Sequence, residues 1–75
     1  MRKAPEIEKT LGDAIRAKRL EKGWSQEELS FESGLHRTYI GAVERGEKNL
    51  TVKNLVQIAR SLGVQASVLM AEASL

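Results

Sequence analysis

One spacing recurs four times in this sequence and predicts most of its fold. A large apolar residue stands five positions before another, and the residue directly after the first one can cap a helix. Trp24 and Leu29 bracket Ser25 in this way. This spacing is that of a hydrophobic staple, so it predicts four helix starts, of which those at histidine and glutamine have the weaker caps. The other three pairs are Leu35 with Ile40 around His36, Leu50 with Leu55 around Thr51, and Val64 with Leu69 around Gln65.

A fifth helix is predicted ahead of these four, over residues 11–22. Leu11 and Ile15 lie four positions apart, as on one face of a helix. Thr10 can cap the start of this helix and Gly23 can end it.

The length of the chain allows one small domain. A domain of 75 residues buries a modest share of its surface, so a single core is expected. No segment alternates between apolar and polar residues, and no sheet is expected. The sequence therefore predicts a compact all-α domain of five helices over residues 10–75, preceded by an N-terminal arm or helical lead-in over residues 1–9.

Composition argues against several classes of protein. The chain has no cysteine, so a disulfide scaffold and a thiolate zinc site are not expected. His36 is the only histidine, and Glu27 and Glu28 are neighbours that point apart in a helix, so no catalytic pair is apparent. No apolar run approaches the roughly 20 residues of a membrane span. We expect a cytoplasmic protein that is not an enzyme, has no membrane partner, and needs no cofactor, metal or small-molecule ligand.

Charge is unevenly distributed although the formal net charge is only +2. Acidic residues dominate residues 21–35, and basic residues dominate residues 36–60. This order favours one cationic surface, with an ordinary solvated face as the alternative.

Residues 24–46 predict two short helices joined by a tight turn at Gly34. Such a unit can place its second helix in the major groove of DNA. If Ile40 and Val43 face the core, Arg37 and Thr38 lie at the outward N-terminal end of that helix. Arginine can donate two hydrogen bonds to guanine and threonine can contact a base or a phosphate, so these two residues are predicted to read the DNA sequence.

Gly41 in the middle of this second helix calls for an explanation. Glycine there costs about 1 kcal/mol relative to alanine. With Ala42 beside it, Gly41 is expected on the outward face, where it would allow close approach to the groove. A tolerated glycine in a short exposed helix is the alternative.

Contacts to phosphate are expected from polar residues that flank the groove. The first amides of the helix that starts at Gln26 form a positive pole, and neutral or cationic side chains around the second helix can add donors. The predicted phosphate-binding residues are Ser25, Gln26, Tyr39, Arg45, Lys48, Asn49 and Lys53.

Two charged residues fall on inward stripes. Arg19 continues the line of Leu11 and Ile15, and Glu44 follows Ile40 by four positions. A buried Arg19–Glu44 ion pair between the first and third helices would account for both. Its expected role is structural, because removing one partner would leave a buried charge unpaired.

The last helix carries more apolar surface than a small domain can easily bury. Val68, Leu69, Met70 and Leu75 are therefore predicted to form the interface of a homodimer, which doubles the length of DNA that one domain can read. The alternative is that this surface docks a different protein, as in an antitoxin-like interaction module.

Three motifs are similar to those of the Cro/C1-type (XRE) helix-turn-helix family of phage and bacterial regulators: IRAKRLEKGWSQEELS, SGLHRTYIGAVERG and LVQIARSLGV. The resemblance covers about residues 11–70 and implies a five-helix, lambda-repressor-like fold that binds double-stranded DNA. It also implies that Arg19 and Glu44 pair across the core, that Gln26 binds phosphate, and that Arg37 and Thr38 read bases.

Within that family, HRTYIGAVERGEKNLTVKNLVQIA resembles the small controller proteins of restriction-modification operons. This implies a compact dimeric regulator that uses Arg37, Thr38 and Tyr39 on DNA. His36 departs from the family's more usual serine or aspartate cap.

Overall fold

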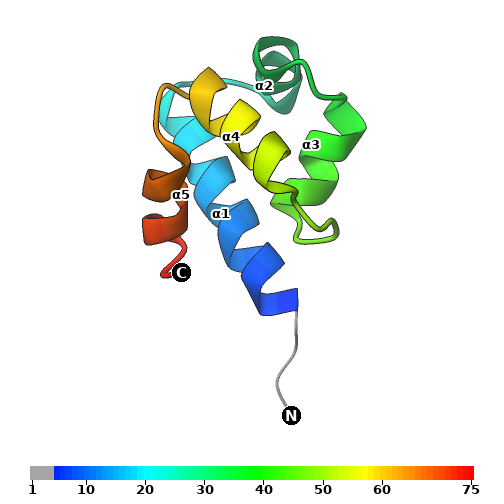
Figure 1. The fold of residues 1–75 in the computed structure, drawn as a ribbon. Coiled ribbons are helices and arrows are strands. Elements are labelled where there is room, and N and C mark those ends of the chain that lie inside the picture. The colour runs from blue at the N-terminus through cyan, green and yellow to red at the C-terminus, as the bar shows by residue number, and fades with distance from the viewer. Residues whose placement is uncertain (1–4) are drawn as a thin grey trace.

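The computed structural model describes residues 5–75, and this part of the chain forms five helices and no strand (Figure 1). The all-α prediction is therefore confirmed. The helices are α1 (Pro5–Glu21), α2 (Gln26–Ser33), α3 (Arg37–Glu44), α4 (Val52–Ser61) and α5 (Ala66–Glu72).

Side-chain caps fix where three of these helices begin. The Ser25 hydroxyl accepts a hydrogen bond from the Glu28 N–H (3.0 Å), and the Glu28 carboxylate accepts one from the Ser25 N–H (2.7 Å). This reciprocal capping box satisfies two amides at the start of α2. His36 Nδ1 accepts the Thr38 N–H at α3, and the Thr51 hydroxyl caps α4. Gln65 precedes α5 without a side-chain cap bond.

The first helix begins earlier than the sequence predicts. Thr10 lies inside α1 and does not cap it, because its hydroxyl donates to the carbonyl of Ile7 one turn back (3.2 Å). Acidic residues in the first turn suit the positive end of the helix, and Lys9 pairs with Asp13 one turn later (2.8 Å). Residues 5–9 therefore follow the helical lead-in and not the arm of the two alternatives, and residues 1–4 lie outside the described residues.

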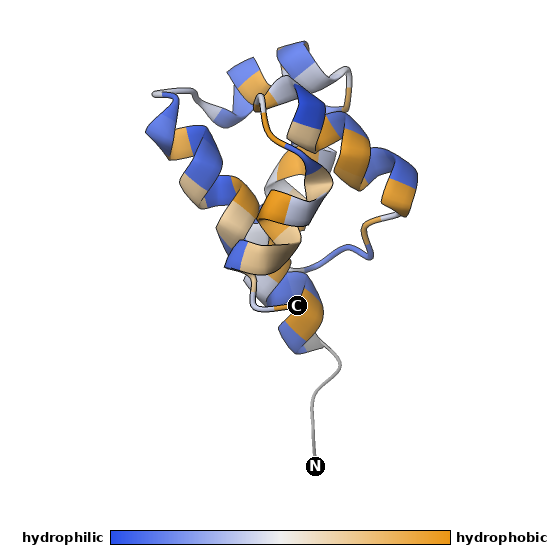
Figure 2. Cartoon of the chain, turned by 60° about the vertical axis from the view of Figure 1, so that its left-hand side comes forward, coloured by the Kyte–Doolittle hydropathy of each residue, from blue (hydrophilic) through white to orange (hydrophobic). Residues whose placement is uncertain are grey.

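The second apolar residue of each staple enters the core. Leu29, Ile40 and Leu69 are fully buried, and Leu55 is almost so. Helix α1 packs against α3 and α5, while α2 contacts α3 and α4. Figure 2 shows apolar segments where the helices meet and hydrophilic segments along their outer edges. The staples therefore mark the starts of α2 to α5 and contribute four of the core residues.

One predicted interface residue belongs to this core. Leu69, expected in a dimer interface, is 0 % exposed within the protomer. The reason is its place as the inward partner of Val64, which packs partly buried against the same core. Leu69 is therefore unavailable to a second copy of the chain. Val68 is half-buried, whereas Met70 and Leu75 are exposed.

Across the described residues, none of the helices has the length and apolar character required to cross a bilayer.

Candidate nucleic-acid interface

The turn between α2 and α3 is held by side chains of α2. Gly34 adopts φ 77°, a left-handed conformation that favours glycine and ends α2. The Ser30 hydroxyl donates to the Leu35 carbonyl (2.6 Å), and the Ser33 hydroxyl oxygen accepts the Leu35 N–H (3.2 Å). These bonds fix the path of the chain between the two helices, so α3 has a defined direction relative to α2.

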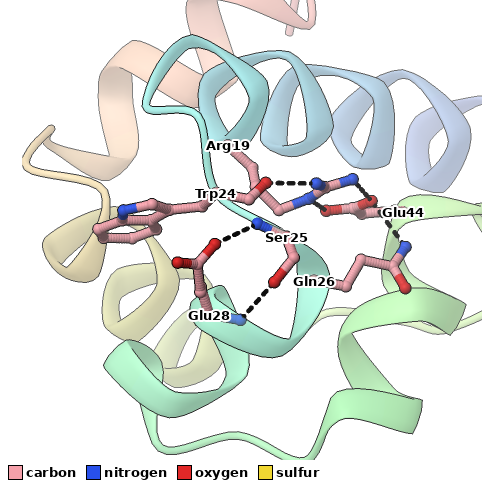
Figure 3. A network of polar contacts seen from close by, with 6 residues as sticks. All are labelled: Arg19, Trp24, Ser25, Gln26, Glu28 and Glu44. Carbon is pink, nitrogen blue, oxygen red and sulfur yellow. Dashed lines mark hydrogen bonds and ion pairs between the residues drawn. The ribbon is translucent and has the colours of Figure 1, made fainter.

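A buried ion pair anchors the C-terminal end of α3 to α1 (Figure 3). Arg19 Nε and Nη2 donate to the two carboxylate oxygens of Glu44, at 2.8 and 3.0 Å, and only 7 % and 2 % of these side chains are exposed. Arg19 Nη1 also donates to the Trp24 carbonyl (2.7 Å). The hydrogen bonds and charge of Glu44 raise the pKa of Arg19 although burial acts in the opposite direction. Three segments of the chain therefore meet at one guanidinium group.

Gln26 joins this network from the start of α2. Its amide nitrogen donates to a carboxylate oxygen of Glu44 (3.0 Å), as Figure 3 shows. An amide NH₂ group has two donors, so one N–H remains for another acceptor. The contact holds the N-terminal end of α2 against α3.

The structure contradicts the outward placement of Gly41 and Ala42. Both residues are buried, and only 7 % of Ala42 is exposed. A Cβ on Gly41 would lie 3.2 Å from Arg45 Nη1 and 3.4 Å from Gln26 Oε1. The small side chains therefore allow Gln26 and Arg45 to cover this part of α3, and Gly41 does not present a bare surface to a groove.

The N-terminal end of α3 is exposed. Arg37 and Thr38, the residues predicted to read bases, are both solvent-exposed. Neither side chain has a hydrogen-bond or ion-pair partner among residues 5–75. Both are therefore available to an external ligand, at the end of α3 opposite to the buried ion pair.

The predicted phosphate-binding residues do not all lie free. The Ser25 oxygen is engaged in the capping box, and the Tyr39 hydroxyl oxygen accepts a hydrogen bond from Asn54 (3.1 Å). Each hydroxyl can still donate its own proton. Arg45 pairs with Glu47 through two hydrogen bonds of 3.0 and 3.1 Å.

The Arg45–Glu47 pair differs from the buried pair because both partners are exposed. The hydrogen bonds from Arg45 lower the pKa of Glu47. Such an exposed pair is weak in water, so a phosphate can compete for the guanidinium group. The pairing of Arg45 with a carboxylate two positions later was readable in the sequence but was not predicted.

The three predicted residues after α3 border two different hollows. Lys48 and Asn49 border a hollow beside α1, together with Ile7 and Glu8. Lys53 borders a different hollow, between α2 and α4. The three side chains are exposed, but they do not form one cluster.

Metal chemistry has no support in this part of the chain, since residues 5–75 contain no group of three or more His, Cys, Asp or Glu side chains close enough to hold an ion.

Comparison with known proteins adds independent information. The family profile HTH_3, described as helix-turn-helix, matches residues 15–69. Control protein C.BamHI of Bacillus amyloliquefaciens is 49 % identical over 55 residues, which cover 72 % of this chain and 68 % of that protein.

Solved structures show the same similarity in three dimensions. The restriction-modification controller protein C.AhdI of Aeromonas hydrophila has a TM-score of 0.81 at 40 % identity, and the match covers 83 % of this chain and 94 % of that one. C.Esp1396I in a nucleoprotein complex has a TM-score of 0.82 at 38 % identity, over 91 % of this chain and 88 % of that one.

Proposed function

We propose that this chain, which belongs to the helix-turn-helix family, is a sequence-specific transcriptional regulator that binds operator half-sites in double-stranded DNA as a homodimer. It is a regulator and not an enzyme. The observation that carries the proposal is the state of α3, whose C-terminal end is anchored in the core while the side chains of Arg37 and Thr38 are exposed and have no partner among residues 5–75.

The mechanism places α3 in the major groove with its N-terminal end toward the base edges. Arg37 donates two hydrogen bonds to one guanine, and Thr38 contacts a neighbouring base or phosphate. Because α1 and α2 hold Glu44, the direction of α3 is fixed before DNA binds. Little ordering of the helix is then needed on binding.

Phosphate contacts position α3 in the groove. The N-terminal end of α2, with Ser25 and Gln26, lies against one strand of the backbone. Tyr39 and Arg45 add donors beside α3, and Lys48, Asn49 and Lys53 provide outer contacts. The separation of Lys53 from Lys48 and Asn49 implies that they approach different phosphates.

The homodimer forms through the outer side of α5 and the residues after it. Ser74 adopts φ 62°, and the chain turns back so that the Leu75 N–H donates to the Met70 carbonyl (2.9 Å). This places Leu75 (50 % exposed) near Met70 (38 % exposed), and half-buried Val68 adds apolar surface from a neighbouring position of α5. Met70→Lys combined with Leu75→Lys yields a folded monomer in this proposal. A dimer that survives both changes contradicts the interface.

The regulated genes are those of a restriction-modification operon, and the protein acts as its controller in the cytoplasm. Support comes from C.BamHI and C.AhdI, which are named as control or controller proteins. Occupancy of the operator then depends on protein concentration and dimerisation.

A salt series tests the function directly. The wild-type protein is titrated into its own upstream DNA and into unrelated DNA at several salt concentrations. The proposal predicts affinity that falls steeply with salt and a clear preference for the upstream DNA. If no salt-sensitive binding occurs, the alternative of a protein-interaction module that docks a partner chain replaces it.

A further inference from the structure

The chain has one histidine, His36, and its two ring nitrogens can make different hydrogen bonds. His36 lies directly before α3, is exposed, and its Nδ1 accepts the backbone N–H of Thr38 at 3.1 Å. A neutral imidazole has one N–H donor and one acceptor nitrogen. When Nδ1 accepts the cap bond, the proton must be on Nε2. The tautomer that caps α3 therefore presents an N–H donor at the outer corner of the ring.

We propose that His36 binds the DNA backbone, with Nε2–H donating to a phosphate oxygen while Nδ1 continues to cap α3. This inference rests on the proposed function. It adds to the interface a residue whose only evident role in the free protein is structural.

The position of the ring favours a phosphate over a base. His36 precedes the exposed pair Arg37 and Thr38, so it lies at the edge of the segment that enters the groove. The first amides of a helix lack partners within the helix, and the cap bond occupies only the one of Thr38. The Nε2–H of His36, which has no partner among residues 5–75, can donate to a phosphate oxygen beside the groove.

Histidine offers a combination that the usual capping residues lack. Aspartate accepts the cap bond but has no proton to donate, and the short side chain of serine uses one oxygen for both tasks. In histidine the acceptor and the donor are separate atoms of one exposed ring. The residue that departs from the common cap can thus cap and bind phosphate simultaneously.

The first test reads the tautomer of the free protein. Nitrogen NMR of the imidazole gives one set of signals, because the chain has a single histidine. At a pH where the ring is neutral, we expect the proton on Nε2, and on addition of operator DNA we expect that proton to exchange more slowly with water. A proton on Nδ1 in the free protein would overturn the inference.

The second test separates the cap from the donor by two substitutions. His36→Asn keeps an acceptor near the position of Nδ1 and is a strong cap, but it lacks the outer donor. His36→Gln places an amide N–H near the position of Nε2 but caps poorly. We expect His36→Asn to unfold at the same urea concentration as the wild type and to lose about 10- to 100-fold in affinity per half-site, the value of one hydrogen bond to a charged group.

His36→Gln should show the reverse pattern. Its urea midpoint should fall, whereas its DNA affinity, corrected for the active fraction, should stay closer to that of the wild type. Wild-type affinity in His36→Asn overturns the inference. So does a larger loss in His36→Gln, because binding would then depend on the cap alone.

Binding measurements on operator DNA and on unrelated DNA show whether the acceptor of the Nε2–H bond is a phosphate or a base. A phosphate contact predicts that His36→Asn loses affinity by the same factor on operator and on unrelated DNA. A loss confined to one base pair overturns the phosphate assignment. Failure of the proposed function has a different signature, since the wild-type protein would then show no salt-sensitive binding to either DNA.

Discussion

The two ends of α3 differ in almost every physical property, although the helix has only eight residues. At the C-terminal end, Ile40 to Glu44 are buried and Glu44 binds both Arg19 and Gln26. At the N-terminal end, Arg37 and Thr38 are exposed and have no side-chain partner within residues 5–75. One helix thus contains both a buried, anchored end and an exposed end without partners in the described chain.

This difference separates two kinds of constraint. Changes at the anchored end alter the stability of the protein, because they disturb packing and buried charge. Changes at the exposed end should leave stability unchanged, because those side chains contribute nothing to the core. If these residues read bases as proposed, such changes should alter DNA binding alone.

Glu44→Ala should have the largest effect on stability. It leaves the guanidinium group of Arg19 buried without its carboxylate partner, and we expect a loss of about 3–5 kcal/mol in the free energy of unfolding. Urea denaturation measures this loss. Glu47→Ala is the matched control, since it breaks the exposed pair with Arg45, and solvent screening should make its cost much smaller than that of Glu44→Ala. Equal losses in the two variants would show that burial does not distinguish them.

Gly12→Ala tests how closely α1 approaches the anchored end of α3. A Cβ at this position would collide with the backbone carbonyl oxygen of Val43 and lie 2.9 Å from that of Glu44. Backbone atoms cannot move aside easily, so we expect a loss of about 1–3 kcal/mol in thermal or urea unfolding.

Gly41→Ala is the comparison for Gly12→Ala. There the new Cβ meets only the flexible ends of Gln26 and Arg45, and removing glycine from a helix stabilises it by up to about 1 kcal/mol. A strong destabilisation by Gly41→Ala would contradict this account of the packing between α2 and α3.

Thr38→Val tests the exposed end with a side chain of almost the same shape. The valine lacks the hydroxyl, so we expect affinity for operator DNA to fall by about 0.5–1.5 kcal/mol per half-site with no change in the urea midpoint. Fluorescence anisotropy and urea unfolding give the two values. A change in stability equal to the change in binding would remove the distinction between the ends of α3.

Lys53→Ala should have the smallest effect. Loss of one phosphate contact weakens binding to all sequences alike and reduces the slope of log affinity against log salt by about 1. A salt titration on operator and unrelated DNA measures both. Sequence-dependent weakening would place Lys53 among the residues that read bases.

The staples made much of the fold predictable from sequence. Their spacing identifies the starts of α2 to α5, and the positions of Arg19 and Glu44 on inward stripes indicate the ion pair that the structure contains. These features follow from spacings within one helix or at its start, so they can be identified without knowing which distant residues come into contact.

The errors arise where burial depends on contacts distant in sequence. Gly41 is covered by Gln26 from another helix, and Leu69 is covered by the core and not by a second copy. The helical period alone does not determine which neighbour covers a given face. The start of α1 stays open in the sequence between an arm and a helical lead-in, because its polar residues give no apolar stripe.

Sequence selection from a random DNA pool, carried out in parallel with the wild type and Arg37→Ala, tests the central claim most directly. The wild type should enrich two half-sites related by a two-fold axis. Arg37→Ala should lose preference at one base pair in each half-site, at about 1–3 kcal/mol, and unfold at the wild-type urea midpoint. Unchanged preference at every position, or an equal weakening on all sequences, would contradict the role of the exposed end of α3 as the reading surface.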